Sequence, residues 1–434
     1  MSSQSALRER AQAGADQAAA VVRSLHAELQ QSTGIALPLR LWDGSELGDG
    51  GAGFRIVLHH PWSLRRLLRP PTDLSAGETY VEGDVDVEGD MIAALETGET
   101  VGRLLASPLD KLRVARQLLR LPRPPRRPHT RRARLRGKRH SQERDRAAIA
   151  FHYDLPQDFY RTFLDDHLVY SCAYFLHADE SLETAQERKL DVICRKLRLQ
   201  PEQRLLDIGC GWGSLLLHAA RHYGVRGVGV TLSRTQAEAG RERIAAAGLA
   251  DRVEIRLADY RELHERFDAV ASVGMFEHVG PDHLPEYFSA AYRLTRPGGL
   301  FCNHGIVTGD ARRVNTGEGR SFVSTYVFPD GGLVPAWRAV REMQAAGFEL
   351  LDVEQLRPSY ALTLRHWVRR LEAGHEAAVA AASETDYRVW RAYMAGSSVA
   401  FAAGRIGVVQ LLGVRAVDGR HDVPFGRRWM LPAS

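Results

Sequence analysis

The sequence predicts an α/β protein with two domains, in which a smaller α+β domain precedes a doubly wound parallel sheet. The chain has 434 residues, more than the roughly 100–200 of a typical domain. From residue 204 onward, strand-like apolar runs alternate with helical stretches, as in a parallel sheet with helices on both faces. Before residue 118, a helical stretch at 5–31 precedes short strand-like runs at 35–44, 54–60 and 79–89, which turn residues separate.

The composition excludes several classes of protein. Hydrophobic residues make up 44% and charged residues 26%, which excludes a mostly disordered chain. The four cysteines (Cys172, Cys194, Cys210 and Cys302) form no C-x-x-C pair and no zinc-like cluster, so we expect neither a disulfide framework nor a metal site. The N-terminal residues lack the apolar core of a signal peptide, and no run approaches the roughly 18 apolar residues of a membrane span. We therefore expect a cytoplasmic protein.

A basic, proline-rich stretch divides the chain unequally. Residues 121–140 hold nine Arg or Lys, four Pro and no acid, and proline and like charge both oppose compact packing. We therefore expect an N-terminal domain at 1–118, a basic linker at 119–142 and a catalytic domain at 143–434. Three interpretations of the linker stay open: a solvated tether, a patch for anionic lipid phosphates, or an arm for nucleic acid.

The most specific local signal is the glycine-rich turn at 206–213, with the sequence LDIGCGWG. It follows a strand-like run and precedes a helical one, so its glycines would let the backbone approach a ligand closely. The spacing is not G-x-G-x-x-G, and the next strand ends at Thr231 without an acid for a dinucleotide ribose. Asp207 would instead suit a cationic amino-acid ligand. The pattern favours S-adenosylmethionine, with Asp259 and Tyr260 at its adenine.

These motifs resemble the cyclopropane-fatty-acid synthase and mycolic acid cyclopropane synthase family, which includes actinobacterial fatty-acid methyl or methylene transferases. Seven stretches over about 250 residues carry the resemblance: FHYDLPQDFY (151–160), VYSCAYF (169–175), LDIGCGWG (206–213), GVTLSRTQ (229–236), VGMFEHVG (273–280), NHGI (303–306) and RPSYALTLRHW (357–367). The resemblance implies a Rossmann-like class I S-adenosylmethionine-dependent methyltransferase domain. It also implies, on weaker similarity, an N-terminal domain that engages lipid.

The resemblance implies two sets of site residues. The cofactor set is Tyr170 and Ser171 at the methionine end, Gly209 and Gly211 beneath it, Thr231, Leu232 and Gln236 at the ribose, and Asp259 and Tyr260 at the adenine. The catalytic set would hold a bicarbonate ion through the backbone of Cys172 and Ile306 and the side chains of Glu277, His304 and Tyr360. Without the resemblance, we would interpret His304 as a structural core histidine and Cys172 as a packed thiol. Tyr360 is expected in a loop after Pro358.

The expected reaction is methyl transfer to a cis double bond in an acyl chain of a membrane phospholipid. An isolated alkene is a weak nucleophile, so contact with the sulfonium methyl and exclusion of water are needed. The carbocation that forms needs nearby negative charge and a base. Proton loss from the new methyl gives a cyclopropane, which we expect. Loss from a chain carbon gives an exocyclic methylene, which is the alternative and would require a reductase partner to become a methyl branch.

One departure from the family bears on the product. The family commonly has a cysteine in a late helical segment resembling N-A-C-A-G-A-F, whereas the corresponding segment here, 395–401, has Ser397 in that place. A changed pocket wall could alter which proton leaves, and this keeps the methylene product open.

Two other classes of function also stay open. One is a methyltransferase for a small molecule or RNA, and the other is a non-catalytic lipid-binding protein. The expected partner is an anionic phospholipid bilayer, with the protein peripheral at the inner membrane face. Self-association is left open, and nucleic acid is not expected.

Overall fold

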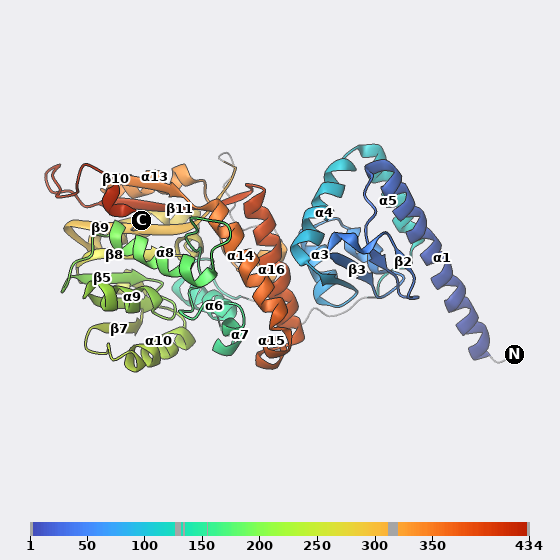
Figure 1. The fold of residues 1–434 in the computed structure, drawn as a ribbon, viewed down its shortest axis with the longest axis horizontal. Coiled ribbons are helices and arrows are strands. Elements are labelled where there is room, and N and C mark those ends of the chain that lie inside the picture. Colours follow the sequence, from blue (N-terminus) through green and yellow to red (C-terminus); the bar gives the residue numbers. More distant parts are fainter. Residues whose placement is uncertain (1–2, 126–131, 133–134, 154, 311–319, 432–434) are drawn as a thin grey trace. The chain divides into compact units, whose positions relative to one another are not determined.

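The computed structural model describes residues 3–125, 132, 135–153, 155–310 and 320–431. By compactness the chain divides into two units (Figure 1). The first contains Met1–Arg132, Arg320–Val327 and Ser383–Val399, and the second contains Ala133–Gly319, Phe328–Ala382 and Ala400–Ser434. Two short segments from the second half of the chain therefore complete the N-terminal unit. Most of the basic stretch, at 126–131 and 133–134, lies outside the described residues.

The N-terminal unit combines a four-stranded sheet with helices. Its strands are β1 (Leu39–Arg40), β2 (Glu46–Leu47), β3 (Phe54–Leu58) and β4 (Val85–Gly89), in the order β2-β1-β3-β4. Its helices are α1 (Ser3–Thr33), α2 (Ser63–Leu68), α3 (Asp73–Val81), α4 (Met91–Leu104), α5 (Pro108–Arg120), α12 (Phe322–Tyr326) and most of α16 (Glu384–Ala402). The strand expected at 79–89 is therefore too long, because Thr79–Val81 form the last turn of α3.

A buried arginine of α16 forms hydrogen bonds with the rest of the N-terminal unit. Arg391 is 5% exposed, and its guanidinium donates to the carbonyls of Val87 and Gly89 at 2.9 and 2.8 Å. It also donates to the hydroxyl of Tyr80 at 3.0 Å. One buried cation therefore satisfies acceptors on β4 and α3, and its removal would leave them without a charged donor.

The catalytic unit contains a seven-stranded sheet. Its strands are β5 (Arg204–Ile208), β6 (Arg226–Thr231), β7 (Val253–Leu257), β8 (Phe267–Val273), β9 (Thr295–Thr308), β10 (Glu349–Gln355) and β11 (Ile406–Val414), in the order β10-β11-β9-β8-β5-β6-β7. Its helices are α6 (Gln142–Tyr153), α7 (Gln157–Arg161), α8 (Leu182–Lys196), α9 (Ser214–Tyr223), α10 (Arg234–Ala246), α11 (Leu284–Leu294), α13 (Ala336–Ala345), α14 (Arg357–Ala373) and α15 (His375–Ala381).

A hydrophobic core lies on each face of this sheet, which confirms the doubly wound prediction. Neighbouring residues of a strand point to opposite faces. Accordingly, Leu205 packs in the core with α8, α9 and α10, whereas Leu206 packs in the core with α11 and α13. The sheet is not wholly parallel, because β11 runs antiparallel to both β9 and β10. The expected loop at Tyr360 is also wrong, since α14 begins at Arg357 and Tyr360 lies in its first turn.

The parallel register brings the carboxyl ends of four strands to one edge of the sheet. Ile208 of β5 lies opposite Val230 of β6 and Ser272 of β8, and Ser272 lies opposite Asn303 of β9. Ligands of open α/β sheets bind at this edge. None of the described helices is apolar over a length that could cross a membrane.

Replacement of Arg391 by methionine should destabilise the protein by about 2–4 kcal/mol, because it leaves buried acceptors without their donor. The expected result is a melting temperature several degrees lower in scanning calorimetry. Arg113→Met is the control, because the Arg113 side chain is 60% exposed and its nearest approach to Asp110 is 4.0 Å. Equal melting temperatures for the two variants would contradict the structural role of Arg391.

Candidate active site

A pocket opens at the carboxyl edge of the sheet, and most of the predicted cofactor residues line it. These are Tyr170, Ser171, Asp207, Gly209, Gly211, Thr231, Leu232, Gln236 and Tyr260. They come from the loop before α8, from the ends of β5 and β6 and the turns that follow them, from the first turn of α10, and from the segment after β7. The structure therefore brings together residues that span 90 positions of sequence.

The glycine-rich turn forms the floor of the pocket. The N–H groups of Gly209 and Cys210 both donate to the carbonyl of Val230, at 2.9 and 3.1 Å, which folds the chain back after β5. Gly209 has a φ of 79°, and a Cβ there would lie 2.9 Å from the Met275 side chain. A side chain at this position would therefore be both strained and obstructed, and glycine keeps the backbone open to a ligand.

A short hydrogen-bond chain lies on the side of the pocket where the sequence predicts the ribose. The Thr231 hydroxyl donates to Gln236 Oε1 at 3.1 Å, and Gln236 is only 4% exposed. The backbone N–H of Gln236 donates to Ser233, which caps α10. With its carbonyl oxygen engaged by Thr231, the Gln236 amide can donate from Nε2 to a hydroxyl in the pocket.

The two predicted adenine residues occupy different positions. Tyr260 lines the pocket, and burial raises the pKa of its phenol, so it stays a neutral stacking surface. Asp259 does not line the pocket. It caps the short helix η2 (Tyr260–Glu262) and accepts from Arg261 through the backbone at 3.0 Å and the guanidinium at 2.6 Å. Its role toward an adenine stays a prediction.

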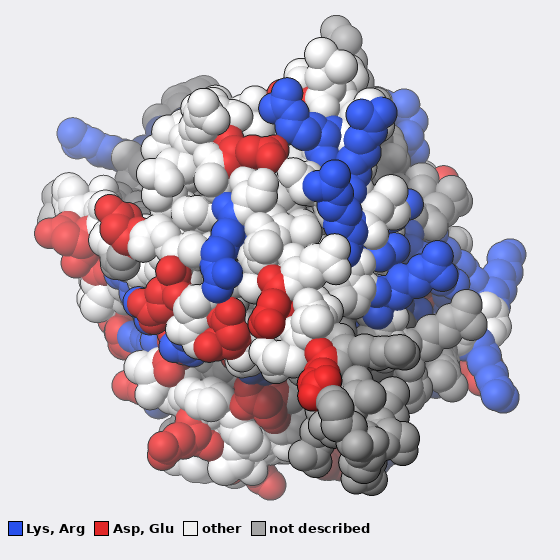
Figure 2. Space-filling model, turned by 90° about the vertical axis from the view of Figure 1, so that its right-hand side faces the viewer, with Lys and Arg blue, Asp and Glu red and all other residues white. Residues whose placement is uncertain are grey.

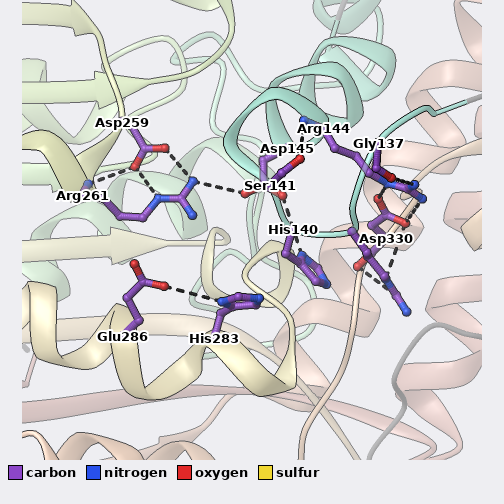
Figure 3. Close-up of polar contacts among 11 residues, drawn as sticks. Gly137, His140, Ser141, Arg144, Asp145, Asp259, Arg261, His283, Glu286 and Asp330 are labelled. Atoms are coloured by element: carbon purple, nitrogen blue, oxygen red, sulfur yellow. Dashed lines mark hydrogen bonds and ion pairs between the residues drawn. The ribbon is translucent and has the colours of Figure 1, made fainter.

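Ion pairs between distant segments form the rim of the pocket (Figure 3). Arg144 of α6 donates twice to Asp330, at 2.5 and 2.9 Å. The Arg261 guanidinium donates to the Asp145 carboxylate of α6 at 3.2 Å and also to the Asp259 carboxylate. The sequence analysis missed these rim residues, because the partners lie 116 or more positions apart and no local motif marks them.

The first catalytic candidate, Glu277, directly follows β8 in the short helix η3 (Phe276–His278). Its neighbours Met275 and His278 line the pocket, although Glu277 does not. Its carboxyl group lies against Gly305, where a Cβ would be 3.0 Å from Oε2, and it accepts a hydrogen bond from the backbone of Ile306. Burial raises its pKa to about 7, so it can hold or release a proton near neutral pH.

His304 lies inside β9 and is 1% exposed, as the sequence predicted for a core position. Burial, aided by the charges of Lys189 and Lys196, lowers its pKa to about 3, so the ring is neutral. Its Nδ1 lies 3.1 Å from Nε2 of Gln410. Because the amide donates to Nδ1, the ring proton is on Nε2.

Glu277 and His304 each have one buried polar atom without a hydrogen-bond partner among the residues that the structure describes. These atoms are Glu277 Oε2 and His304 Nε2. Buried polar atoms are rarely left in this state without a ligand or water. The Glu277 carboxyl lies against Gly305, the residue that follows His304 in β9. An N–H donor and a carboxyl group are the kinds of group that suit a small oxyanion such as bicarbonate, which accepts through its oxygens and donates through its hydroxyl.

Two of the other three catalytic candidates, Cys172 and Tyr360, contact Leu356 just before α14, and the third, Ile306, is linked to Leu356 through Val408. The Leu356 carbonyl accepts from the Tyr360 N–H at 3.1 Å and lies 3.8 Å from Cys172 Sγ. The Leu356 N–H donates to Val408, the cross-strand partner of Ile306. Burial raises the pKa of the Cys172 thiol, which stays protonated as expected of a packed thiol. None of these three residues lines the pocket.

Ser397 is half-buried in α16 and belongs to the N-terminal unit.

Comparison with known proteins identifies the family. Residues 140–411 match the family model "Mycolic acid cyclopropane synthetase". A "Probable fatty acid methyltransferase" of Pseudomonas putida is 39% identical over 92% of this chain and 97% of that relative. The tuberculostearic acid methyltransferase of Mycobacterium tuberculosis is 35% identical over 90% of this chain and 91% of that relative.

A solved structure supports the cofactor assignment. The mycolic acid cyclopropane synthase CmaA1, complexed with SAH and CTAB, is 34% identical and superposes with a TM-score of 0.58 over 62% of this chain and 98% of that one. The predicted class I fold and its S-adenosylmethionine dependence are therefore confirmed. The chain belongs to the mycolic acid cyclopropane synthetase family of S-adenosylmethionine-dependent methyltransferases.

Proposed function

We propose that the protein transfers the methyl group of S-adenosylmethionine to a cis double bond in an acyl chain of a membrane phospholipid. The observation that carries this proposal is the pair of unpartnered buried atoms, Glu277 Oε2 and His304 Nε2, beside the cofactor pocket. Methylation of an alkene needs a dry site with a base, whereas methylation of an amine or a hydroxyl does not need to manage a carbocation.

Two products can follow from the same carbocation. Relatives named as fatty acid methyltransferases match 90% or more of this chain, which favours a methylene product that a partner reductase converts to a methyl branch. Relatives named as cyclopropane mycolic acid synthases match about 61%. Ring closure, the product expected from the sequence, is the second candidate. The family model and the catalytic residues suit ring closure as well as they suit the methylene product.

The catalytic residues have distinct tasks in this proposal. S-adenosylmethionine supplies an electrophilic methyl group, and bicarbonate would supply a small base held by Glu277 and His304. The neutral His304 ring donates from Nε2. Glu277, with a pKa near 7, accepts or returns the proton that leaves the acyl chain.

Aromatic rings and a protonated thiol suit the neighbourhood of a carbocation. The Tyr360 ring packs against Phe401 with centroids 4.6 Å apart and against Trp367 at 6.1 Å. Ring faces attract a cation without forming a bond to it. The buried Cys172 is a neutral thiol and therefore a poor trap for the cation.

Incubation of the purified protein with S-adenosylmethionine and an oleoyl phospholipid should add one CH2 to the acyl chain, detected by mass spectrometry. Proton NMR then separates the two products. Vinylidene protons identify the methylene product, and high-field ring protons identify the cyclopropane. No added mass on any unsaturated phospholipid would overturn the proposed substrate.

Replacement of Glu277 by glutamine should lower the rate of product formation by about 100-fold or more, because it removes the group that takes the proton. Affinity for S-adenosylhomocysteine, measured by calorimetry, should change less than twofold, since Glu277 does not line the cofactor pocket. Glu238→Gln is the control, because the Glu238 side chain is 60% exposed on α10. A Glu277→Gln enzyme as active as the control would refute this role.

We further propose that the N-terminal unit docks on an anionic membrane through α4 and α5. Four leucines are 50–74% exposed on these helices: Leu104, Leu109, Leu112 and Leu119. Basic residues lie exposed among them: Arg103, Lys111, Arg113, Arg116 and Arg120. Figure 2 shows Lys and Arg gathered toward one side of the visible face, away from most of the Asp and Glu. Exposed apolar residues within a basic surface suit insertion among anionic headgroups.

Replacement of both Leu109 and Leu112 by serine should weaken binding to phosphatidylglycerol-containing vesicles about tenfold or more, because two side chains lose their burial in lipid. Cosedimentation measures the effect. The control is Leu431→Ser, a leucine 53% exposed near the C-terminus. Equal binding of the two variants, or binding that ignores salt, would contradict docking through this surface.

A further inference from the structure

Gln410 of β11 is a fully buried polar residue beside the proposed catalytic histidine. In the antiparallel pairing of β9 with β11, Gln410 lies directly opposite His304, so the two side chains share one face of the sheet. Gln410 is 0% exposed, and its Nε2 lies 3.1 Å from His304 Nδ1. Both strands are paired on each side within the sheet. The register of two interior strands therefore sets this contact.

The Gln410 side chain adds little to the stability of the core. Burial of an amide is costly unless its polar atoms form hydrogen bonds. The Gln410 Oε1 is buried and has no hydrogen-bond partner in the part of the chain that the structure describes. An apolar side chain of similar size would occupy this position without that cost. The presence of an amide here therefore points to a role in the chemistry of His304.

The surroundings keep the His304 ring neutral. Burial, with the charges of Lys189 and Lys196, lowers the pKa of the ring to about 3. Glu354 of β10 lies opposite Gln410 on the other side, but its carboxylate accepts from Lys196 at 2.5 Å and is engaged by that cation. A neutral imidazole carries one ring proton, so the group that contacts Nδ1 decides which nitrogen holds it.

An amide nitrogen donates hydrogen bonds and does not accept them. We propose that Gln410 is a positioning residue that holds His304 in the tautomer with its proton on Nε2, so that this nitrogen presents a donor to a bound oxyanion. The oxyanion and the reaction rest on the proposed function. The proposal adds that the donor is selected from β11, a strand that contributes no residue to the lining of the cofactor pocket.

Steady-state turnover of Gln410 variants tests this role. Gln410→Glu keeps the shape of the side chain, but its carboxylate accepts from Nδ1 and should move the ring proton to that nitrogen. We expect kcat to fall about 100-fold or more, as when a catalytic histidine is held in the wrong tautomer. Gln410→Met removes only the donor and should lower kcat about tenfold. The KM for S-adenosylmethionine should change less than twofold in both variants, because Gln410 does not line the cofactor pocket.

Gln355→Glu is the matched control. Gln355 of β10 accepts through Oε1 from the backbone N–H of Val408 at 3.0 Å, a hydrogen bond that a glutamate retains, so kcat should stay at the wild-type value. Scanning calorimetry should show that Gln410→Met melts at or above the wild-type temperature. A lower melting temperature with an unchanged kcat would mean that Gln410 is structural, and would overturn the proposal.

Nitrogen-15 NMR of protein labelled in its histidines reads the tautomer directly and needs no lipid. The His304 signals are those that disappear in His304→Gln. We expect the ring proton on Nε2 in the wild type and on Nδ1 in Gln410→Glu. A wild-type proton on Nδ1 would overturn the proposal whatever the lipid assay shows. A wild-type proton on Nε2 in a protein that modifies no lipid would refute the proposed function and leave the effect of Gln410 on His304 standing.

Discussion

The burial of polar groups at the carboxyl edge of the sheet is the constraint on which the site depends. Asp207, Lys189 and His304 are each 3% exposed or less, in surroundings where an unpaired charge or donor is costly. The two hydrophobic cores on either face of the sheet supply the stability that holds them there. The fold thus keeps these polar groups out of solvent at the edge of the sheet where the pocket opens.

Much of this architecture could be predicted because its causes are local. The alternation of strands and helices follows from side-chain periodicity within each segment. The glycine turn could be recognised because a positive φ at Gly209 and a close approach to its backbone exclude other residues. Glu277 could be placed because it directly follows a buried strand, where parallel sheets carry functional residues.

The rest depends on contacts that no local pattern encodes. Pairing of Arg144 with Asp330 joins residues 186 positions apart, and Arg391 completes a unit whose strand β4 lies 302 or more positions earlier. The antiparallel direction of β11 is set by its partners β9 and β10 and not by its own apolar sequence. Lys189 looks like an ordinary helix residue until the fold buries it beside the pocket.

The distribution of charge limits the positive charge that the carbocation of the proposed reaction would meet. Lys196 is balanced by Asp352 and Glu354, at 3.2 and 2.5 Å. Lys189 donates to the hydroxyl of Ser171 at 2.9 Å, and the carboxyl groups of Asp165 and Asp207 offset its charge. His304 stays neutral because burial and these lysines lower its pKa to about 3, so it adds no positive charge. Glu277 supplies a carboxyl group that ionises near neutral pH, and in the proposed reaction the cation would meet aromatic faces, a neutral donor and a proton acceptor.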